Sequence, residues 1–160
     1  TTFHVYLPAS TRDRPGPVGA KPDAHRGGGR VLLVEDEAPV RAVTEKMLAG
    51  MGYDVVSAHD GAEAIECFRR NQAGGRPFDL AVIDLTMPGG MGGVELVSEL
   101  AKIDPSVRAI ATTGYSEDPV VAHPERYGFL SVIVKPFTLD ELGKTMQKVM
   151  AKPPSGTTPA

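Results

Sequence analysis

Short runs of apolar residues alternate with amphipathic segments between about residue 30 and residue 151. Such a run predicts a strand buried on both faces, and apolar residues three and four apart predict a helix that packs on a sheet. The predicted strands are Arg30–Val34, Tyr53–Ala58, Phe78–Ile83, Val107–Ala111 and Ser131–Val134. The predicted helices are Pro39–Met51, with Val40, Val43, Met47 and Leu48 at helical spacing, Gly61–Arg70, Val94–Ile103 and Leu139–Ala151. This alternation predicts an α/β domain with a parallel sheet covered on both faces.

The segment between the last two predicted strands contains Pro119 and Pro124. Proline is poorly tolerated inside a helix, because it lacks the backbone N–H and its ring clashes with the preceding turn. We therefore expect a short or broken helix at about Glu117–Tyr127.

Two flanking segments differ in composition from this domain. Residues 8–29 are rich in Pro, Gly and Arg and almost free of apolar residues, which predicts a flexible linker. Residues 152–160 have a similar composition, which predicts a disordered tail. Before the linker, Thr2–Leu7 alternates with a period of two, as a half-buried strand does. That strand is interpreted as the end of another domain, and the alternative is an added edge strand on the main sheet.

Composition excludes several classes of partner. The chain has 160 residues, enough for one buried core, and a formal net charge of −3 gives no electrostatic case for nucleic acid. No apolar run approaches the roughly 20 residues of a membrane span, so we expect no membrane contact in this fragment. A single cysteine, Cys67, and the absence of a signal-peptide pattern suit a reducing, cytoplasmic compartment.

Charged residues follow three of the predicted strands. Glu35 and Asp36 follow the first strand, Asp84 the third and Lys135 the fifth. Because the carboxyl ends of parallel strands share one edge of a sheet, where such sheets bind ligands, these side chains should converge. Grouped carboxylates need a positive partner, and magnesium prefers oxygen ligands. The alternative for Asp36 is that it caps the following helix.

Asp84 is the predicted nucleophile of this site. Four apolar residues precede it and hold its backbone, and a carboxylate can accept a phosphoryl group as an acyl phosphate. Lys135 and a cation would neutralise charge on the phosphoryl oxygens. The Lys135–Pro136 peptide bond is a candidate for the cis form. Thr112 and Thr113 carry hydroxyls that either donate to a phosphoryl oxygen or bond to their own turn.

Together these residues resemble the receiver domain of two-component response regulators, over residues 30–151. The resemblance rests on Glu35-Asp36, Asp84 with Met87-Pro88 following, Thr113 before Gly114, and Lys135-Pro136-Phe137. It implies a flavodoxin-like, doubly wound, five-stranded parallel sheet of strand order 2-1-3-4-5. It also implies that Asp84 accepts a phosphoryl group from phosphohistidine, on a histidine kinase or a histidine phosphotransfer domain, or from a small donor such as acetyl phosphate.

The resemblance further implies a role for each site residue. Asp36, Asp84 and the backbone carbonyl of Thr86 would bind Mg2+, with Glu35 acting mainly through water. Thr113 and Lys135 would contact the phosphoryl oxygens. Many receivers carry an aromatic residue three positions before the lysine; this chain has Val132 there, and Tyr115 is a candidate substitute.

Two features resemble hybrid sensor histidine kinases. The loop after Asp84 carries an extra glycine, and residues 1–7 resemble the last strand of a kinase ATP-binding domain. We therefore expect a C-terminal fragment of a hybrid kinase: residues 1–7 a strand remnant, 8–29 a linker, 30–151 the receiver. The fragment is not expected to be an enzyme beyond its own phosphorylation, and the parent kinase can be membrane-anchored.

Two alternatives remain open at this point. A haloacid-dehalogenase-type phosphatase also uses an aspartyl nucleophile and magnesium, but places the nucleophile after its first strand with a second Asp two residues later. Here Thr86 occupies that second position. The other alternative is a receiver-like interaction module that is never phosphorylated, against which the complete acidic set argues.

Overall fold

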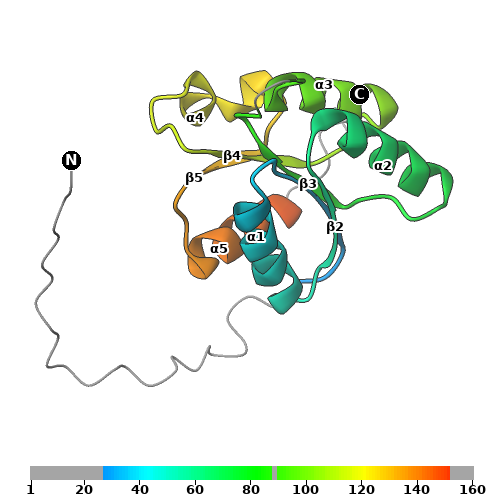
Figure 1. Cartoon of the computed structure of the whole chain (residues 1–160), viewed down its shortest axis with the longest axis horizontal. Helices are drawn as coiled ribbons and strands as arrows, with labels where there is room; N and C mark the ends of the chain where they lie inside the picture. The colour runs from blue at the N-terminus through cyan, green and yellow to red at the C-terminus, as the bar shows by residue number, and fades with distance from the viewer. Residues whose placement is uncertain (1–26, 88–89, 152–160) are drawn as a thin grey trace, which may run out of the picture.

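The computed structural model describes residues 27–87 and 90–151, and within them one five-stranded parallel sheet of order β2-β1-β3-β4-β5 (Figure 1). The strands are β1 (Arg30–Val34), β2 (Asp54–Ala58), β3 (Leu80–Asp84), β4 (Ala109–Thr113) and β5 (Ser131–Val134). The helices are α1 (Ala38–Gly50), α2 (Gly61–Ala73), α3 (Gly93–Ile103), α4 (Pro119–Ala122) and α5 (Leu139–Met150), with a 3-10 turn, η1, at Pro124–Tyr127. The doubly wound fold and its strand order are confirmed. The predicted N-terminal strand, residues 8–26 of the predicted linker and the predicted tail lie outside the described residues. The last three linker residues are described and are joined to the domain: the N–H of Gly27 donates to the Met51 carbonyl at 2.8 Å, and the Gly29 carbonyl accepts from the N–H of Asp54 at 2.9 Å.

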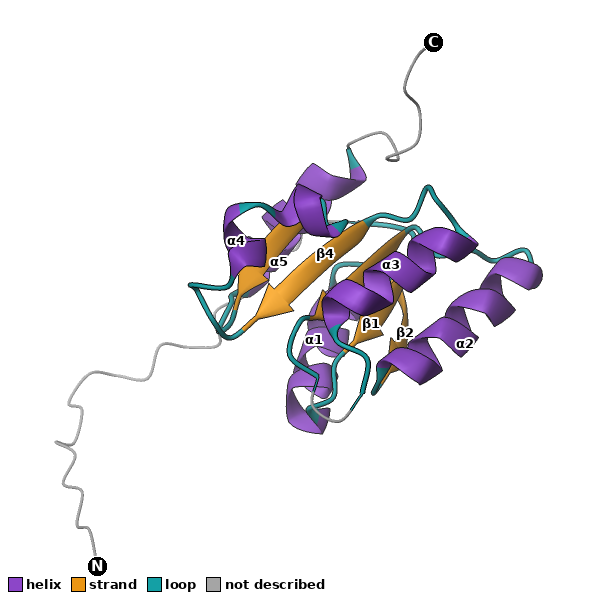
Figure 2. Cartoon of the chain, turned by 90° about the horizontal axis from the view of Figure 1, so that it is seen from above, coloured by secondary structure: helices purple, strands orange, loops and turns teal. Residues whose placement is uncertain are grey.

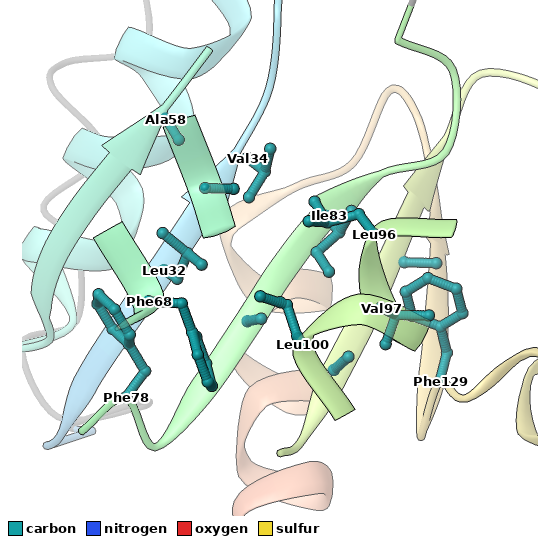
Figure 3. Close-up of a cluster of buried hydrophobic side chains, with 14 of the residues drawn as sticks. Leu32, Val34, Ala58, Phe68, Phe78, Ile83, Leu96, Val97, Leu100 and Phe129 are labelled. Carbon is teal, nitrogen blue, oxygen red and sulfur yellow. The ribbon is translucent and has the colours of Figure 1, made fainter. Parts of the chain in front are cut away.

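Helices cover both faces of the sheet, α1 and α5 on one and α2, α3 and the short α4 on the other (Figures 1 and 2). On the second face, side chains of β1 and β3 meet those of α2 and α3 (Figure 3). Phe68 of α2 stacks on Phe78, with ring centroids 5.8 Å apart. Alternate strand residues enter the two cores, which explains why β1 and β3 are continuous apolar runs.

Strand β4 begins two residues later than predicted, and this moves both threonines into the sheet. The cause is a turn built on Asp104, whose Oδ1 accepts hydrogen bonds from the N–H and the hydroxyl of Ser106. Val107 still belongs to this turn, since its N–H donates to the Asp104 carbonyl. Thr112 and Thr113 are therefore the last residues of the strand, where the sequence placed them just after it.

The broken helix expected before β5 is confirmed. Helix α4 has four residues. Its N-cap, Asp118, accepts from the N–H of Val120 at 2.8 Å, and its C-cap is His123. Pro124 then starts η1, because its ring cannot continue the preceding helix.

The apolar stripe of α1 only partly enters the core. Thr44 and Leu48 are buried, whereas Val43 is 53% exposed. Val40 and Val43 line a groove with Pro136 and Phe137, and Met47 lines the same groove while also packing against the core.

Across the part of the chain that the structure describes, every helix is too short or too polar to span a membrane.

Candidate functional site

The carboxyl ends of β1, β3 and β5 bring together three charged side chains that are remote in sequence. The Nζ of Lys135 lies 2.6 Å from the Oε2 of Glu35 and 2.8 Å from the Oδ2 of Asp84. The side chains of Glu35 and Asp84 are only 3% and 5% exposed, so this is a buried double ion pair. Parallel pairing of the strands produces it, because all of them end at the same edge of the sheet (Figure 2).

Asp36 adds a third carboxylate to this edge. Glu35, Asp36 and Asp84 each offer an oxygen within 4.8 Å of the others, and no other such cluster occurs among residues 27–87 and 90–151. The helix-capping alternative for Asp36 is wrong, since the N-cap of α1 is Glu37 and makes no side-chain cap bond. Asp36 is partly exposed and faces a cavity of about 400 Å³ that His59, Asp60 and Met91 also line.

These residues fit a divalent cation. The Oε1 of Glu35 is buried and has no hydrogen-bond partner, an arrangement that is costly for a carboxylate. The three side chains supply the hard oxygen ligands that Mg2+ prefers, while partial exposure of Asp36 leaves room for the waters that the ion keeps. The unpaired Oε1 of Glu35 and the ligand chemistry of the three carboxylates therefore both support a site for a divalent cation.

Burial and neighbouring charges shift the pKa values of Glu35 and Lys135. Burial raises the pKa of Glu35, and the negative charge of Asp84 adds to that rise, although the hydrogen bond from Lys135 opposes it. For Lys135, burial alone would lower the pKa, but the hydrogen bonds to Asp84 and Glu35 outweigh it and the pKa is raised. Lys135 is therefore a fixed positive charge at neutral pH.

Thr113 connects the fourth strand to this site. Its backbone carbonyl accepts from the N–H of Lys135 at 2.7 Å, and its fully buried hydroxyl oxygen accepts from the N–H of Tyr115 at 3.1 Å. The hydroxyl therefore bonds within its own turn, yet its proton remains available to a second acceptor. The two roles considered for this hydroxyl, a bond within its own turn and donation to a phosphoryl oxygen, are therefore compatible.

The Asp84 carboxylate is held on both of its oxygens. The N–H of Thr86 donates to Oδ1 at 3.2 Å, while Lys135 holds Oδ2. The backbone at this strand end is also tightly packed, since a Cβ on Gly93 would lie 2.5 Å from the Asp84 carbonyl oxygen. Only glycine allows the start of α3 to approach this closely.

The peptide bond between Lys135 and Pro136 is cis, as predicted. Among the other expected residues, Val132 is half-buried against the core beneath α3 and α4, whereas Tyr115 is 66% exposed. Cys67 is buried on α2.

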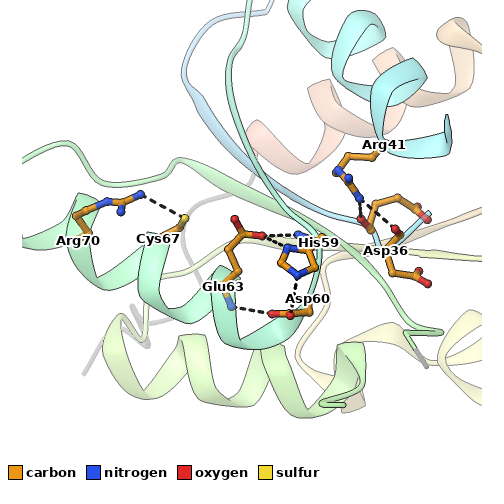
Figure 4. Close-up of polar contacts among 8 residues, drawn as sticks. Asp36, Arg41, His59, Asp60, Glu63, Cys67 and Arg70 are labelled. Carbon is orange, nitrogen blue, oxygen red and sulfur yellow. Dashed lines mark hydrogen bonds and ion pairs between the residues drawn. The ribbon is translucent and has the colours of Figure 1, made fainter. Parts of the chain in front are cut away.

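Sequence reasoning missed two polar groups near the site (Figure 4). Arg41 donates to backbone carbonyls of the acidic doublet, and no local pattern indicates this, because a carbonyl carries no residue identity. His59 contacts the carboxylates of Asp60 and Glu63, and Asp60 caps α2 by accepting from the N–H of Glu63. The Asp-x-x-Glu spacing before a helix was the available signal for this second group.

With this geometry established, comparisons with known proteins identify the family. Residues 31–147 match the model of the response regulator receiver domain, so the chain belongs to that family. It is 35% identical to the sensor kinase CckA of Brucella abortus over 95% of this chain, yet spans only 17% of the length of that protein. It is 31% identical to the chemotaxis protein CheY of Thermotoga maritima, over 76% of this chain and 98% of CheY.

A solved structure supports the same assignment. The receiver domain of the sensor histidine kinase PA1611 of Pseudomonas aeruginosa PAO1, which holds a magnesium ion in its active site cleft, superposes with a TM-score of 0.68. The two are 26% identical over 79% of this chain and all of that one. Membership of the receiver family excludes the haloacid-dehalogenase-type alternative.

Proposed function

We propose that the domain is a phosphoacceptor of a two-component system, which takes a phosphoryl group onto Asp84 in a magnesium-dependent relay. The observation that carries this proposal is the ammonium of Lys135, which bridges the buried carboxylates of Glu35 and Asp84. A receiver-like interaction module would have no need of two buried carboxylates, because their burial is costly without a chemical use.

The residues around Asp84 suit in-line transfer. A carboxylate oxygen of Asp84 attacks phosphorus, the P–N bond of a phosphohistidine breaks, and the imidazole leaves with the electron pair and takes up a proton. Lys135 neutralises charge on the transferred oxygens, and the hydroxyl proton of Thr113 is donated to one of them. Because Thr86 N–H and Lys135 already orient the nucleophile, little reorganisation is needed during the reaction.

Glu35, Asp36, Asp84 and the backbone carbonyl of Thr86 would hold the cation, Glu35 mainly through water. When bound, Mg2+ supplies neutralisation of the charge that collects on the phosphoryl oxygens. The oxygen of Glu35 that lacks a hydrogen-bond partner supports this assignment.

A groove on the surface supports a protein as the donor. It has a volume of about 500 Å³, is lined mainly by Pro39, Val40, Val43 and Phe137, and continues to Lys135. An apolar surface that ends at the acceptor site suits a partner that must present a phosphohistidine there. A histidine kinase or a histidine phosphotransfer domain is such a partner.

We also propose that the chain is the C-terminal part of a hybrid sensor kinase. Its similarity to CckA extends over 95% of the chain, which is more than the receiver domain alone. On this proposal residues 1–7 end the kinase ATP-binding domain, residues 8–29 are a linker, residues 30–151 are the receiver and residues 152–160 are a tail. The receiver would then act on the cytoplasmic side, whether or not the parent kinase is anchored in a membrane.

The test is addition of Mg2+ with beryllofluoride, a mimic of the phosphoryl group, followed by amide NMR spectra. We expect perturbation of the Asp84, Thr113 and Lys135 signals, and we expect Asp84→Asn to remove both this response and covalent labelling by acetyl phosphate. Unchanged signals at all three residues would mean a module that is not phosphorylated. Multiple turnover of a generic phosphomonoester would also contradict the proposal, because a phosphoacceptor domain is not expected to turn over such a substrate.

A further inference from the structure

We infer that Arg41 is a positioning residue for the acidic doublet, acting on the backbone of Glu35 and Asp36 rather than on their carboxylates. One guanidinium nitrogen, Nη1, donates to the Glu35 carbonyl at 2.6 Å and to the Asp36 carbonyl at 3.1 Å (Figure 4). Arg41 lies in the first turns of α1 and is partly buried, so the contact is part of the folded domain.

No side-chain cap holds the turn between β1 and α1. The N-cap of α1, Glu37, makes no side-chain cap bond, and no acidic residue occupies the first turn of the helix. Capping by a side chain is the usual way to hold a helix start, and here it is absent. Arg41 supplies the restraint from inside the helix, where its own N–H donates to the Glu37 carbonyl at 2.9 Å.

The two hydrogen bonds from Arg41 determine where the carboxylates of Glu35 and Asp36 point. The N–H of Glu35 is held by the carbonyl of Ala58 on β2 at 3.2 Å, and Arg41 holds the next two carbonyls. With these groups held, the two peptide planes that follow Glu35 and Asp36 are both restrained. One side chain of the doublet then turns into the buried ion pair with Lys135, and the other turns toward solvent beside it.

This inference rests on the proposed function, since its consequence is for cation binding. Groups that orient metal ligands typically change metal affinity by 10- to 100-fold when removed. We therefore expect Arg41→Met to weaken Mg2+ binding by about tenfold or more. The Mg2+ affinity of Arg41→Lys should lie between those of the original protein and Arg41→Met, because an ammonium keeps the charge and offers several N–H donors on one nitrogen, but stands on a shorter side chain than a guanidinium.

The experiment uses the full chain and a matched control, Arg69→Met, which alters an exposed arginine of α2. Carbonyl 13C shifts of Glu35 and Asp36, measured without metal, report the two hydrogen bonds directly. We expect both shifts to move in Arg41→Met and neither to move in Arg69→Met. Mg2+ affinity is then measured by titration of the amide signals.

Phosphorylation by acetyl phosphate as a function of Mg2+ concentration gives a second readout. We expect the half-saturating Mg2+ concentration of Arg41→Met to rise while the maximal rate stays near that of the original protein. Affinity within twofold of the original, or a lower maximal rate at an unchanged half-saturating concentration, would overturn the inference. If Arg41→Met does not fold, the same measurements on Arg41→Lys decide the question. Absence of Mg2+ binding by the original chain would instead contradict the proposed function.

Discussion

The ammonium of Lys135 lies 2.8 Å from the carboxylate of Asp84, although the two residues are 51 positions apart in sequence. The same ammonium also holds Glu35, so one positive charge compensates two buried negative charges. A third carboxylate, Asp36, completes the cluster. The metal-free site therefore carries more negative than positive charge, and its stability should respond to any change in that balance.

Lys135→Met tests the compensation directly. Removal of the ammonium leaves two buried carboxylates without their donor, and we expect the metal-free domain to lose about 1–3 kcal/mol of unfolding free energy. Mg2+ should recover more stability in the variant than in the original protein, because the ion then binds a more negative cluster. Urea unfolding with and without Mg2+ measures both effects. Lys148→Met, at an exposed position of α5, is the control and should change neither; weaker Mg2+ stabilisation of Lys135→Met would contradict the prediction.

Glu35→Gln tests the raised pKa of Glu35. The folded protein binds the Glu35 proton more tightly than the unfolded chain does, so the stability that this proton contributes is lost as pH rises above the ordinary value of 4.5. Without metal, we therefore expect Glu35→Gln to be more stable than the original protein at pH 7, and the difference to shrink as pH falls. Urea unfolding over a pH series measures this. Parallel pH profiles would refute the prediction, and Glu66→Gln, at an exposed position of α2, controls for loss of a surface charge.

Neighbouring glycines at the start of α3 should respond oppositely to substitution. A Cβ on Gly93 would lie 2.5 Å from the Asp84 carbonyl oxygen and 2.9 Å from the Leu85 Cα, so Gly93→Ala must shift the backbone at Asp84 and Leu85. We expect a loss of about 1–3 kcal/mol, typical of overpacking. Gly92 is the N-cap, its φ is −72°, and the nearest atom to a Cβ there lies 3.9 Å away.

Gly92→Ser should therefore stabilise the domain by several tenths of a kcal/mol, through a cap bond and a less flexible unfolded chain. Thermal unfolding of the two variants separates these effects. Equal destabilisation by Gly93→Ala and Gly92→Ser would show that the close contact between Gly93 and the Asp84 carbonyl does not determine which substitutions the start of α3 tolerates.

Val43→Glu tests the apolar groove as the surface for the phosphoryl donor. Val43 is 53% exposed, so a carboxylate there should leave the fold intact while opposing an apolar contact. We expect transfer from a phosphorylated histidine phosphotransfer domain to slow by tenfold or more, and phosphorylation by acetyl phosphate to stay unchanged. Val94→Glu, at a valine of α3 that is 39% exposed, is the matched control. Equal rates for the two variants with the protein donor would place the docking surface elsewhere.

Most of the fold was predictable from the residue pattern, for reasons that are local. Strand β1 was predicted with its observed bounds, because charged residues flank its short apolar run on both sides. The break before β5 was predictable since Pro124 cannot continue a helix. Strand β4 was misplaced by two residues, because the Asp104 turn keeps Val107 out of the sheet and such side-chain bonds leave little trace in hydropathy.

The candidate site also combines features that the sequence predicts with features that depend on tertiary packing. The carboxylates and the lysine could be assigned to one edge from the chain alone, because parallel strands that end in charge must present it on the same side. The role of Arg41 and the exposure of Val43 could not be predicted. Both depend on tertiary packing: a backbone carbonyl accepts a hydrogen bond from whichever donor the fold brings near, and an apolar side chain is buried only where a neighbouring element covers it.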